Sequence, residues 1–157
     1  DRAHAQGAAL WLLRFQRRGW NAGAGPVPSP VPDAQWALEE ARRELGELPV
    51  VLLGHSMGAR TAVAVADHPS VSGVVALAPW LPADEPVRAL TGKRLAAAHG
   101  RADKITSFRA TETFVRRAGS VASGTELVDM GAVGHYMFRR VGAWNDFAVT
   151  RSLELLG

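Results

Sequence analysis

The residues Gly54-His55-Ser56-Met57-Gly58 form a short stretch whose types and spacing can do chemistry. They follow the aliphatic run "VVLL" and precede an alanine-rich segment of helical character. A serine in such a strand-to-helix turn is held in a strained backbone conformation that exposes its hydroxyl at the edge of a sheet. The flanking glycines lack the Cβ atoms that would collide with the strand and the helix. This pattern predicts that Ser56 is a nucleophile and that the backbone N–H of Met57 donates to an oxyanion, the alternative being a Gly-Ser turn with no chemistry.

A serine hydroxyl is a weak nucleophile, so it needs a histidine to accept its proton and a carboxylate to orient that histidine. The chain has five histidines, namely His4, His55, His68, His99 and His135. His135 stands in the glycine-flanked sequence "MGAVGHYMFRR", after a predicted strand, where a loop can reach back over the sheet edge. We therefore predict that His135 is the base, and we expect structural roles for the other four.

Two aspartates compete to be the orienting acid. Asp103 in "AHGRADKIT" follows one predicted strand by a short loop, and Asp84 in "PWLPADEP" follows the strand before it. A carboxylate at either place can reach His135, because parallel strands end at the same edge of a sheet. We favour Asp103, whose simpler interpretation is a turn or cap residue.

Apolar runs bounded by glycine or proline alternate with amphipathic segments, which is typical of βαβ units and a mostly parallel sheet. Alanine favours helices, so 94–100 is ambiguous by composition, but its place in the alternation favours a strand. The prolines at 26, 28, 30 and 32 predict an extended loop, and Asp33 is expected to cap the helix that follows. We predict an α/β fold in which a sheet of about five strands has helices on both faces. The expected strands are 10–15, 50–54, 72–78, 94–100 and 125–130, and the expected helices are 33–45, 57–68, 107–119 and 144–156.

Composition limits the other function classes. The 157 residues, 47% of them hydrophobic, suit a single domain over 1–157. The net charge of +3 comes from scattered arginines, which predicts a solvated surface and no nucleic-acid partner. With no cysteine, no credible set of metal ligands and no phosphate-binding loop, we expect no metal and no cofactor.

No apolar run approaches the roughly 20 residues of a membrane span, and without a visible signal peptide we expect a cytoplasmic protein. The oligomeric state stays open.

Three motifs together resemble the serine hydrolases of the α/β-hydrolase fold, a three-layer sandwich. They are "LLGHSMG", "AHGRADKIT" and "GAVGHYM", in the family's chain order of nucleophile, acid and histidine. The resemblance implies Ser56 as nucleophile, Met57 as a backbone oxyanion donor, Asp103 as acid and His135 as general base. It also implies acyl transfer to water through an acyl-enzyme. The Ala/Arg/Gly-rich composition is similar to that of small hydrolases of high-GC bacteria.

One departure from this resemblance concerns the start of the chain. "LLRFQRRGWN" resembles the family's fourth strand and "VVALAPWLP" its sixth, so the earlier strands and the loop with the second oxyanion donor are missing. We therefore expect a domain that is incomplete at its N-terminus. Either 10–15 pairs directly with 50–54, or the chain is a fragment of a longer protein. Loss of one oxyanion donor costs on the order of 100 to 1,000-fold in rate.

The substrate is less determined by the sequence. Only the short segment 80–93 stands where the family often inserts a helical cap, so we expect an open site that takes an ester, thioester or amide of a small acyl group. His55 and Trp80 are candidates to line its pocket, with a core role for Trp80 the alternative. Two further functions stay open: a non-catalytic binding domain without a complete oxyanion hole, and an acyltransferase or perhydrolase with the same triad.

Overall fold

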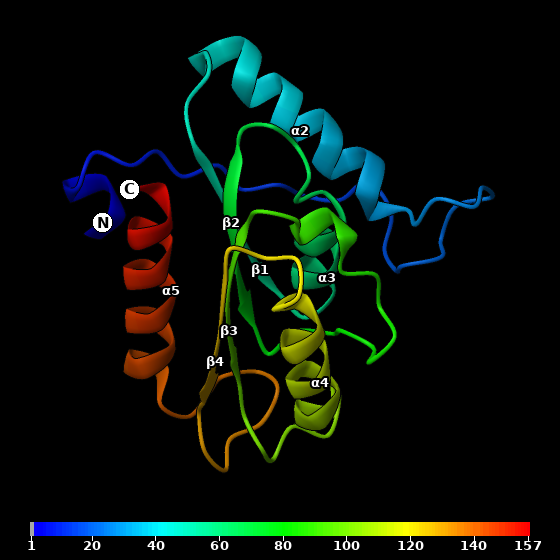
Figure 1. Cartoon of the computed structure of the whole chain (residues 1–157), viewed down its shortest axis with the longest axis vertical. Helices are drawn as coiled ribbons and strands as arrows, with labels where there is room; N and C mark the ends of the chain where they lie inside the picture. Colours follow the sequence, from blue (N-terminus) through cyan, green and yellow to red (C-terminus); the bar gives the residue numbers. More distant parts are fainter. Residues whose placement is uncertain (1) are drawn as a thin grey trace.

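The computed structural model describes residues 2–157 and has a parallel sheet at its centre. Within these residues the sheet has four strands, in the order β1 (Val50–His55), β2 (Val71–Leu77), β3 (Arg94–His99) and β4 (Gly124–Asp129). Each strand pairs in parallel with its neighbour, and the register sets His55 beside Leu77 and His99 beside Asp129. All carboxyl ends therefore meet at one edge of the sheet, at the lower end of the molecule in Figure 1.

Helices cover both faces of this sheet. Helices α3 (Met57–Ala64) and α4 (Phe108–Ala118) lie on one face, and α5 (Val141–Leu156) lies on the other, as Figure 1 shows. A 3₁₀ turn, η1 (Arg88–Leu90), and a four-residue helix, α1 (Arg2–Ala5), complete the described elements with α2 (Pro30–Leu45). The predicted α/β class, with helices on both faces of a mostly parallel sheet, is confirmed.

The two central strands explain why their sequences are apolar without alternation. In β2 and β3, Val74 and Ala97 point into the core beneath α3 and α4, whereas their neighbours Val75 and Ala96 point into the core beneath α5. A strand that is buried on both faces gains from apolar residues at every position. This burial also decides the ambiguous segment 94–100 in favour of a strand, despite its three consecutive alanines.

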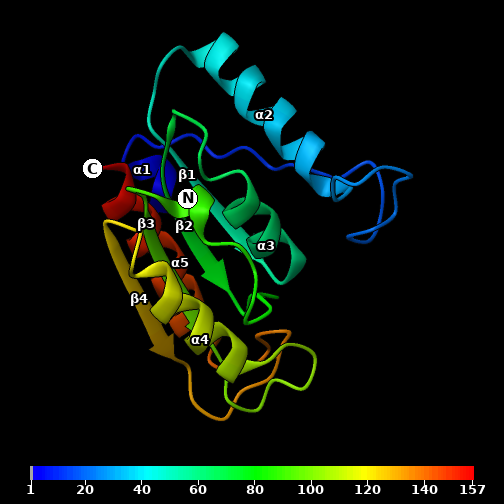
Figure 2. The same cartoon turned by 45° about the vertical axis from the view of Figure 1, so that its right-hand side comes forward.

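The predicted strand 10–15 is wrong. Residues 8–15 have no regular secondary structure, and Leu10 and Leu12 are 76% and 96% exposed. A strand needs a neighbouring strand to satisfy its backbone groups, and β1 pairs only with β2 among the described residues. Direct pairing of 10–15 with the elbow strand is therefore excluded in this structure. Figure 2 shows the segment running as an extended trace beneath α2.

Helix α2 begins earlier than its prolines suggested. Pro30 and Pro32 lie in its first turn, where the missing N–H of a proline costs no helical hydrogen bond. Asp33 is therefore inside the helix and does not cap it; its carboxylate accepts a hydrogen bond from the Gln16 backbone N–H at 2.8 Å. The helix packs against α3, and its last residue, Leu45, is exposed.

Candidate active site

Ser56 occupies the sharp turn between β1 and α3. Its backbone has φ 54° and ψ −118°, a strained conformation for a residue with a side chain. A Cβ atom at Gly54 would lie 2.4 Å from the carbonyl carbon of Gly58 and 2.5 Å from the backbone nitrogen of Ala59. Strand and helix therefore approach so closely that position 54 has room only for glycine. A Cβ at Gly58 meets nothing within 4 Å, so the predicted collision holds for Gly54 alone.

Met57 is the first residue of α3. The first backbone N–H groups of a helix have no partner inside it, and they lie at the positive end of its dipole. The Met57 N–H is thus placed beside the Ser56 side chain at the start of the helix, which is what an oxyanion donor requires. Its role as that donor stays a prediction.

His135 reaches Ser56 from the loop that follows β4. Its Nε2 lies 3.0 Å from Ser56 Oγ, and its Nδ1 lies 2.8 Å from Asp103 Oδ2. The ring is 6% exposed, and the Asp103 side chain is fully buried. An ionised carboxylate only accepts hydrogen bonds, so Nδ1 carries the proton, and Nε2 is free to accept the serine hydroxyl. The structure therefore joins the three predicted residues in one chain of hydrogen bonds.

The loops that carry Asp103 and His135 are packed tightly together. A Cβ atom at Gly100 would lie 2.2 Å from the carbonyl oxygen of Val133, two residues before His135. The backbone N–H of Arg101 also donates to the Gly131 carbonyl at 2.8 Å. This close contact brings His135 over the carboxylate of Asp103.

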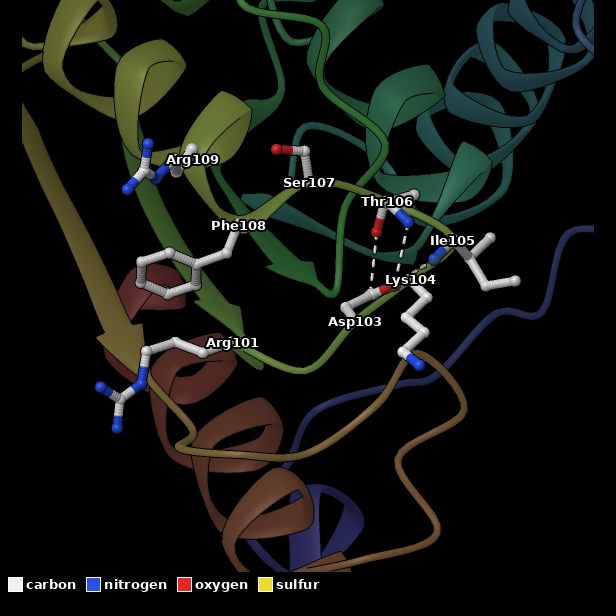
Figure 3. Close-up of a pocket in the computed structure, with 8 residues that line it drawn as sticks. All are labelled: Arg101, Asp103, Lys104, Ile105, Thr106, Ser107, Phe108 and Arg109. Carbon is white, nitrogen blue, oxygen red and sulfur yellow. Dashed lines mark hydrogen bonds between the residues drawn. The ribbon is translucent and has the colours of Figure 1, made fainter.

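Asp103 accepts hydrogen bonds on both of its oxygens. Oδ1 accepts from the backbone N–H groups of Ile105 and Thr106, each at 2.8 Å, and Oδ2 accepts from the Thr106 hydroxyl at 2.9 Å. Figure 3 shows how this loop folds back on the aspartate. Burial by itself raises the pKa of Asp103, but the hydrogen bonds from Thr106, His135 and Ile105 outweigh it and lower the pKa to about 2. The carboxylate is therefore ionised at neutral pH.

The rival acid does not join this network. Asp84 is exposed, and in the described part of the chain the carboxylate bonded to His135 is that of Asp103. The structure thus brings Asp103, and not Asp84, to His135, and the role of Asp103 as the acid stays a prediction.

The two predicted pocket residues lie close to Ser56. His55 Nε2 is 2.9 Å from the His135 carbonyl oxygen, and the two rings are 4.7 Å apart between centroids. The backbone N–H of Trp80 donates to the Ser56 carbonyl at 3.1 Å, and its side chain is 37% exposed. His55 therefore supports the His135 loop, and the role of both residues as pocket walls stays a prediction.

Trp80 also takes part in a cluster around Arg60 of α3. The Arg60 guanidinium lies 4.1 Å from the ring centroid of Trp20 and 4.4 Å from that of Trp80. It also forms a largely buried ion pair with Glu85 at 2.5 Å. Attraction between a cation and the faces of two indoles holds Trp20 of the N-terminal segment against α3, which begins directly after Ser56.

Sequence reasoning missed three polar residues behind the acid. Thr106 donates to Asp103, and His99, expected to be structural only, contacts the same carboxylate at 3.1 Å. Thr111 of α4 lies 2.8 Å from the other nitrogen of His99. The spacing of His99 and Asp103 in "AHGRAD" was the available signal, since a residue at a strand end and one four positions later share the same tight loop.

No metal site accompanies these residues. Across positions 2–157, no three His, Cys, Asp or Glu side chains are grouped so that they could hold a metal ion. None of the helices in this range is both long and apolar enough to cross a membrane.

The parallel sheet and the strained serine turn define the class of protein: an α/β fold with a serine in a strained strand-to-helix turn. The family model described as "Alpha/beta hydrolase family" matches residues 2–155, and the chain belongs to this family. A search of curated protein sequences gives no match.

Solved structures with the same fold are found at low sequence identity. An α/β serine hydrolase homologue from Coxiella burnetii is 20% identical, with a TM-score of 0.67; the match covers 82% of this chain and 64% of that one. Esterase 2 of Thermogutta terrifontis, phosphoramylated by tabun, is 16% identical, with a TM-score of 0.68 and coverage of 82% and 63%. A monoacylglycerol lipase of Paleococcus ferrophilus is 15% identical, with a TM-score of 0.64 and coverage of 80% and 75%. The chain thus spans less than two thirds of the length of the first two structures.

Proposed function

We propose that this chain carries the catalytic residues of a serine hydrolase that cleaves an ester of a small acyl group. The observation that carries the proposal is the continuous hydrogen-bond chain from Ser56 through His135 to Asp103, with the serine in a strained elbow. Membership of the α/β-hydrolase family supports the same chemistry.

The proposed reaction has two halves. Ser56 Oγ attacks the ester carbonyl carbon while its proton passes to His135 Nε2, and the Met57 N–H stabilises the oxyanion. The C–O bond to the alcohol then breaks, and the alcohol leaves with the proton held by His135. Water repeats the sequence on the acyl-enzyme, which releases the carboxylic acid and restores Ser56. Asp103 stays ionised throughout, consistent with its low pKa.

A small acyl group suits the surroundings of the serine. The segment that joins β2 to β3 contains only the 3₁₀ turn η1, so no helical cap rises from it over Ser56. Trp80 offers a partly exposed indole beside the elbow. We therefore expect acetyl and butyryl esters of p-nitrophenol to be cleaved faster than the palmitoyl ester.

Labelling with a fluorophosphonate tests the nucleophile directly. The reagent forms a stable adduct only with an activated serine, and intact mass with peptide mapping locates it. We expect one adduct, on Ser56, and none on the folded Ser56→Ala variant. An adduct elsewhere, or none on the folded wild-type chain, would contradict the proposal for this chain.

A competing nucleophile separates hydrolysis from acyl transfer. With p-nitrophenyl acetate in the presence of methanol or hydrogen peroxide, we expect acetate as the main product at low acceptor concentration. Predominant methyl ester or peracid would instead indicate an acyltransferase or a perhydrolase.

A further inference from the structure

His99 is a fully buried histidine at the end of β3, directly behind the acid of the site. Its Nε2 lies 3.1 Å from Asp103 Oδ2, the same oxygen that accepts the hydrogen bond from His135. Its Nδ1 lies 2.8 Å from the hydroxyl of Thr111, which is also fully buried. Both ring nitrogens are thus bound, and the ring cannot turn without breaking two hydrogen bonds.

The two partners of His99 determine which of its ring nitrogens carries the proton. The nitrogen that faces an ionised carboxylate carries the hydrogen, so Nε2–H donates to Asp103 and Nδ1 accepts from Thr111. Burial lowers the pKa of His99, while its attraction to Asp103 acts in the opposite direction. His99 is therefore neutral at physiological pH and a donor of fixed direction.

The other side-chain donor behind Asp103 has no fixed direction. His135 Nδ1 and His99 Nε2, each 3.2 Å from the Thr106 hydroxyl oxygen, carry protons of their own, so the hydroxyl hydrogen can go only to Asp103 Oδ2 at 2.9 Å or to the Ala78 carbonyl oxygen at 3.4 Å. A hydroxyl has one proton and rotates between such acceptors. His99, held by Thr111, is the side chain that fixes where Oδ2 presents itself to His135.

We propose that His99 is a positioning residue for the proposed hydrolysis: its Nε2–H orients Oδ2 of Asp103, and through it the His135 ring. The inference rests on the proposed function. No hydrogen bond joins His99 to Ser56 in the described residues, so it acts through Asp103 and does not touch the reacting atoms. The groups around the ring are Asp103, Thr106, Thr111, His135 and the edge of Phe108, whose ring centroid is 5.9 Å away.

Two amide variants distinguish this role from simple packing. The amide nitrogen of glutamine occupies the place of Nε2, so His99→Gln keeps a donor toward Asp103. The shorter asparagine reaches only the place of Nδ1, so His99→Asn keeps the contact with Thr111 and loses the donor. With p-nitrophenyl acetate we expect His99→Asn to lower kcat about tenfold with little change in KM, and His99→Gln to stay within about threefold of wild type.

A nuclear magnetic resonance measurement gives a readout that does not depend on turnover. The His135 Nδ1 proton, shared with Asp103, is expected to give a downfield proton signal in the wild type and in His99→Gln, and to lose it in His99→Asn. If the wild-type chain turns over no ester, the proposed function fails, while this signal still tests the inference.

Three outcomes decide the matter. Loss of the signal and of kcat in His99→Asn alone supports the positioning role. Equal losses in both variants, or no loss in either, overturn it. If His99→Asn fails to fold by circular dichroism, Thr111→Val replaces it: this variant frees the ring while keeping its volume, and we expect a several-fold fall in kcat, whereas wild-type kcat would overturn the inference.

Discussion

The acid loop, residues 100–107, and the N-terminal segment, residues 6–29, are both irregular, yet they differ in how their polar groups are satisfied. In the acid loop, the Asp103 side chain is fully buried and is held by backbone and side-chain donors. In the N-terminal segment, two leucines are largely exposed, and few hydrogen bonds reach the rest of the molecule, one of them from Gln16 to Asp33. The difference teaches that irregular backbone can bury a charged group when hydrogen bonds satisfy it, whereas apolar residues alone do not bury a segment.

The largest effect is expected from a change of Asp103, the hydrogen-bond acceptor at the centre of the acid loop. Asp103→Asn replaces one accepting oxygen by an NH₂ group that itself donates, and it removes the charge that stabilises the His135 imidazolium. We therefore expect kcat to fall by about 10⁴-fold. Asp84→Asn, at an exposed position, is the matched control and should leave kcat within about twofold of wild type. Steady-state kinetics with p-nitrophenyl acetate measure both, and a larger loss in Asp84→Asn would move the acid to the preceding loop.

A methyl group at the elbow gives the next largest effect. In Gly54→Ala the new Cβ would overlap the backbone of α3, and we expect a loss of about 3 kcal/mol or more in the free energy of unfolding. Gly58→Ala adds the same atom where it meets nothing, and we expect a change within about 1 kcal/mol. Urea unfolding followed by circular dichroism compares the pair, and similar losses in both would contradict the close strand-to-helix contact.

The pH dependence of stability measures the acid loop without a kinetic assay. Because folding lowers the pKa of Asp103 to about 2, the folded state binds this proton more weakly than the unfolded state. Its contribution of roughly 2 kcal/mol is complete above pH 4 and is lost as the pH falls through about 2. Asp103→Asn should therefore lose less stability than wild type between pH 4 and pH 2 in urea titrations. Parallel curves would show that this carboxylate is not specially stabilised.

The smallest changes in the free energy of unfolding are expected from substitutions in the N-terminal segment, which has few contacts with the rest of the molecule. Trp20→Ala removes one face of the Arg60 cluster, and we expect a loss of about 1 to 2 kcal/mol in the free energy of unfolding. Leu12→Ser changes a side chain that is 96% exposed, and we expect less than about 0.5 kcal/mol. The same urea experiment measures both, and a large loss in Leu12→Ser would reveal packing of this segment that the structure does not contain.

Most of the parallel sheet could be predicted from the sequence, and so could the chain order of the three motifs that meet at its edge. Gly54, Ser56 and the buried strand before them form a local pattern, so the elbow was predictable from neighbours in the chain. The meeting of Asp103 and His135 beside Ser56 was predictable because the loops after parallel strands lie at one edge of the sheet.

The failures came where a distant partner decides the outcome. The segment 10–15 has the composition of a strand, but its state depends on whether another strand lies beside it, which composition does not reveal. His99 was given a structural role alone, because the contact with Asp103 depends on how the loop after β3 turns back on itself. Proline in the first turn of α2 was taken as a loop signal, although the same residue suits the start of a helix.

The cluster of Arg60 with Trp20 and Trp80 has an optical consequence. Two of the five tryptophans lie against a cation one helical turn from Ser56, and the backbone N–H of Trp80 binds the carbonyl of that serine. Any chemical event that shifts the elbow changes the electric field and the solvent contact of these indoles. On the proposed function, we therefore expect acylation of Ser56 to change the tryptophan fluorescence, and stopped flow can follow that change without a dye or a chromogenic substrate.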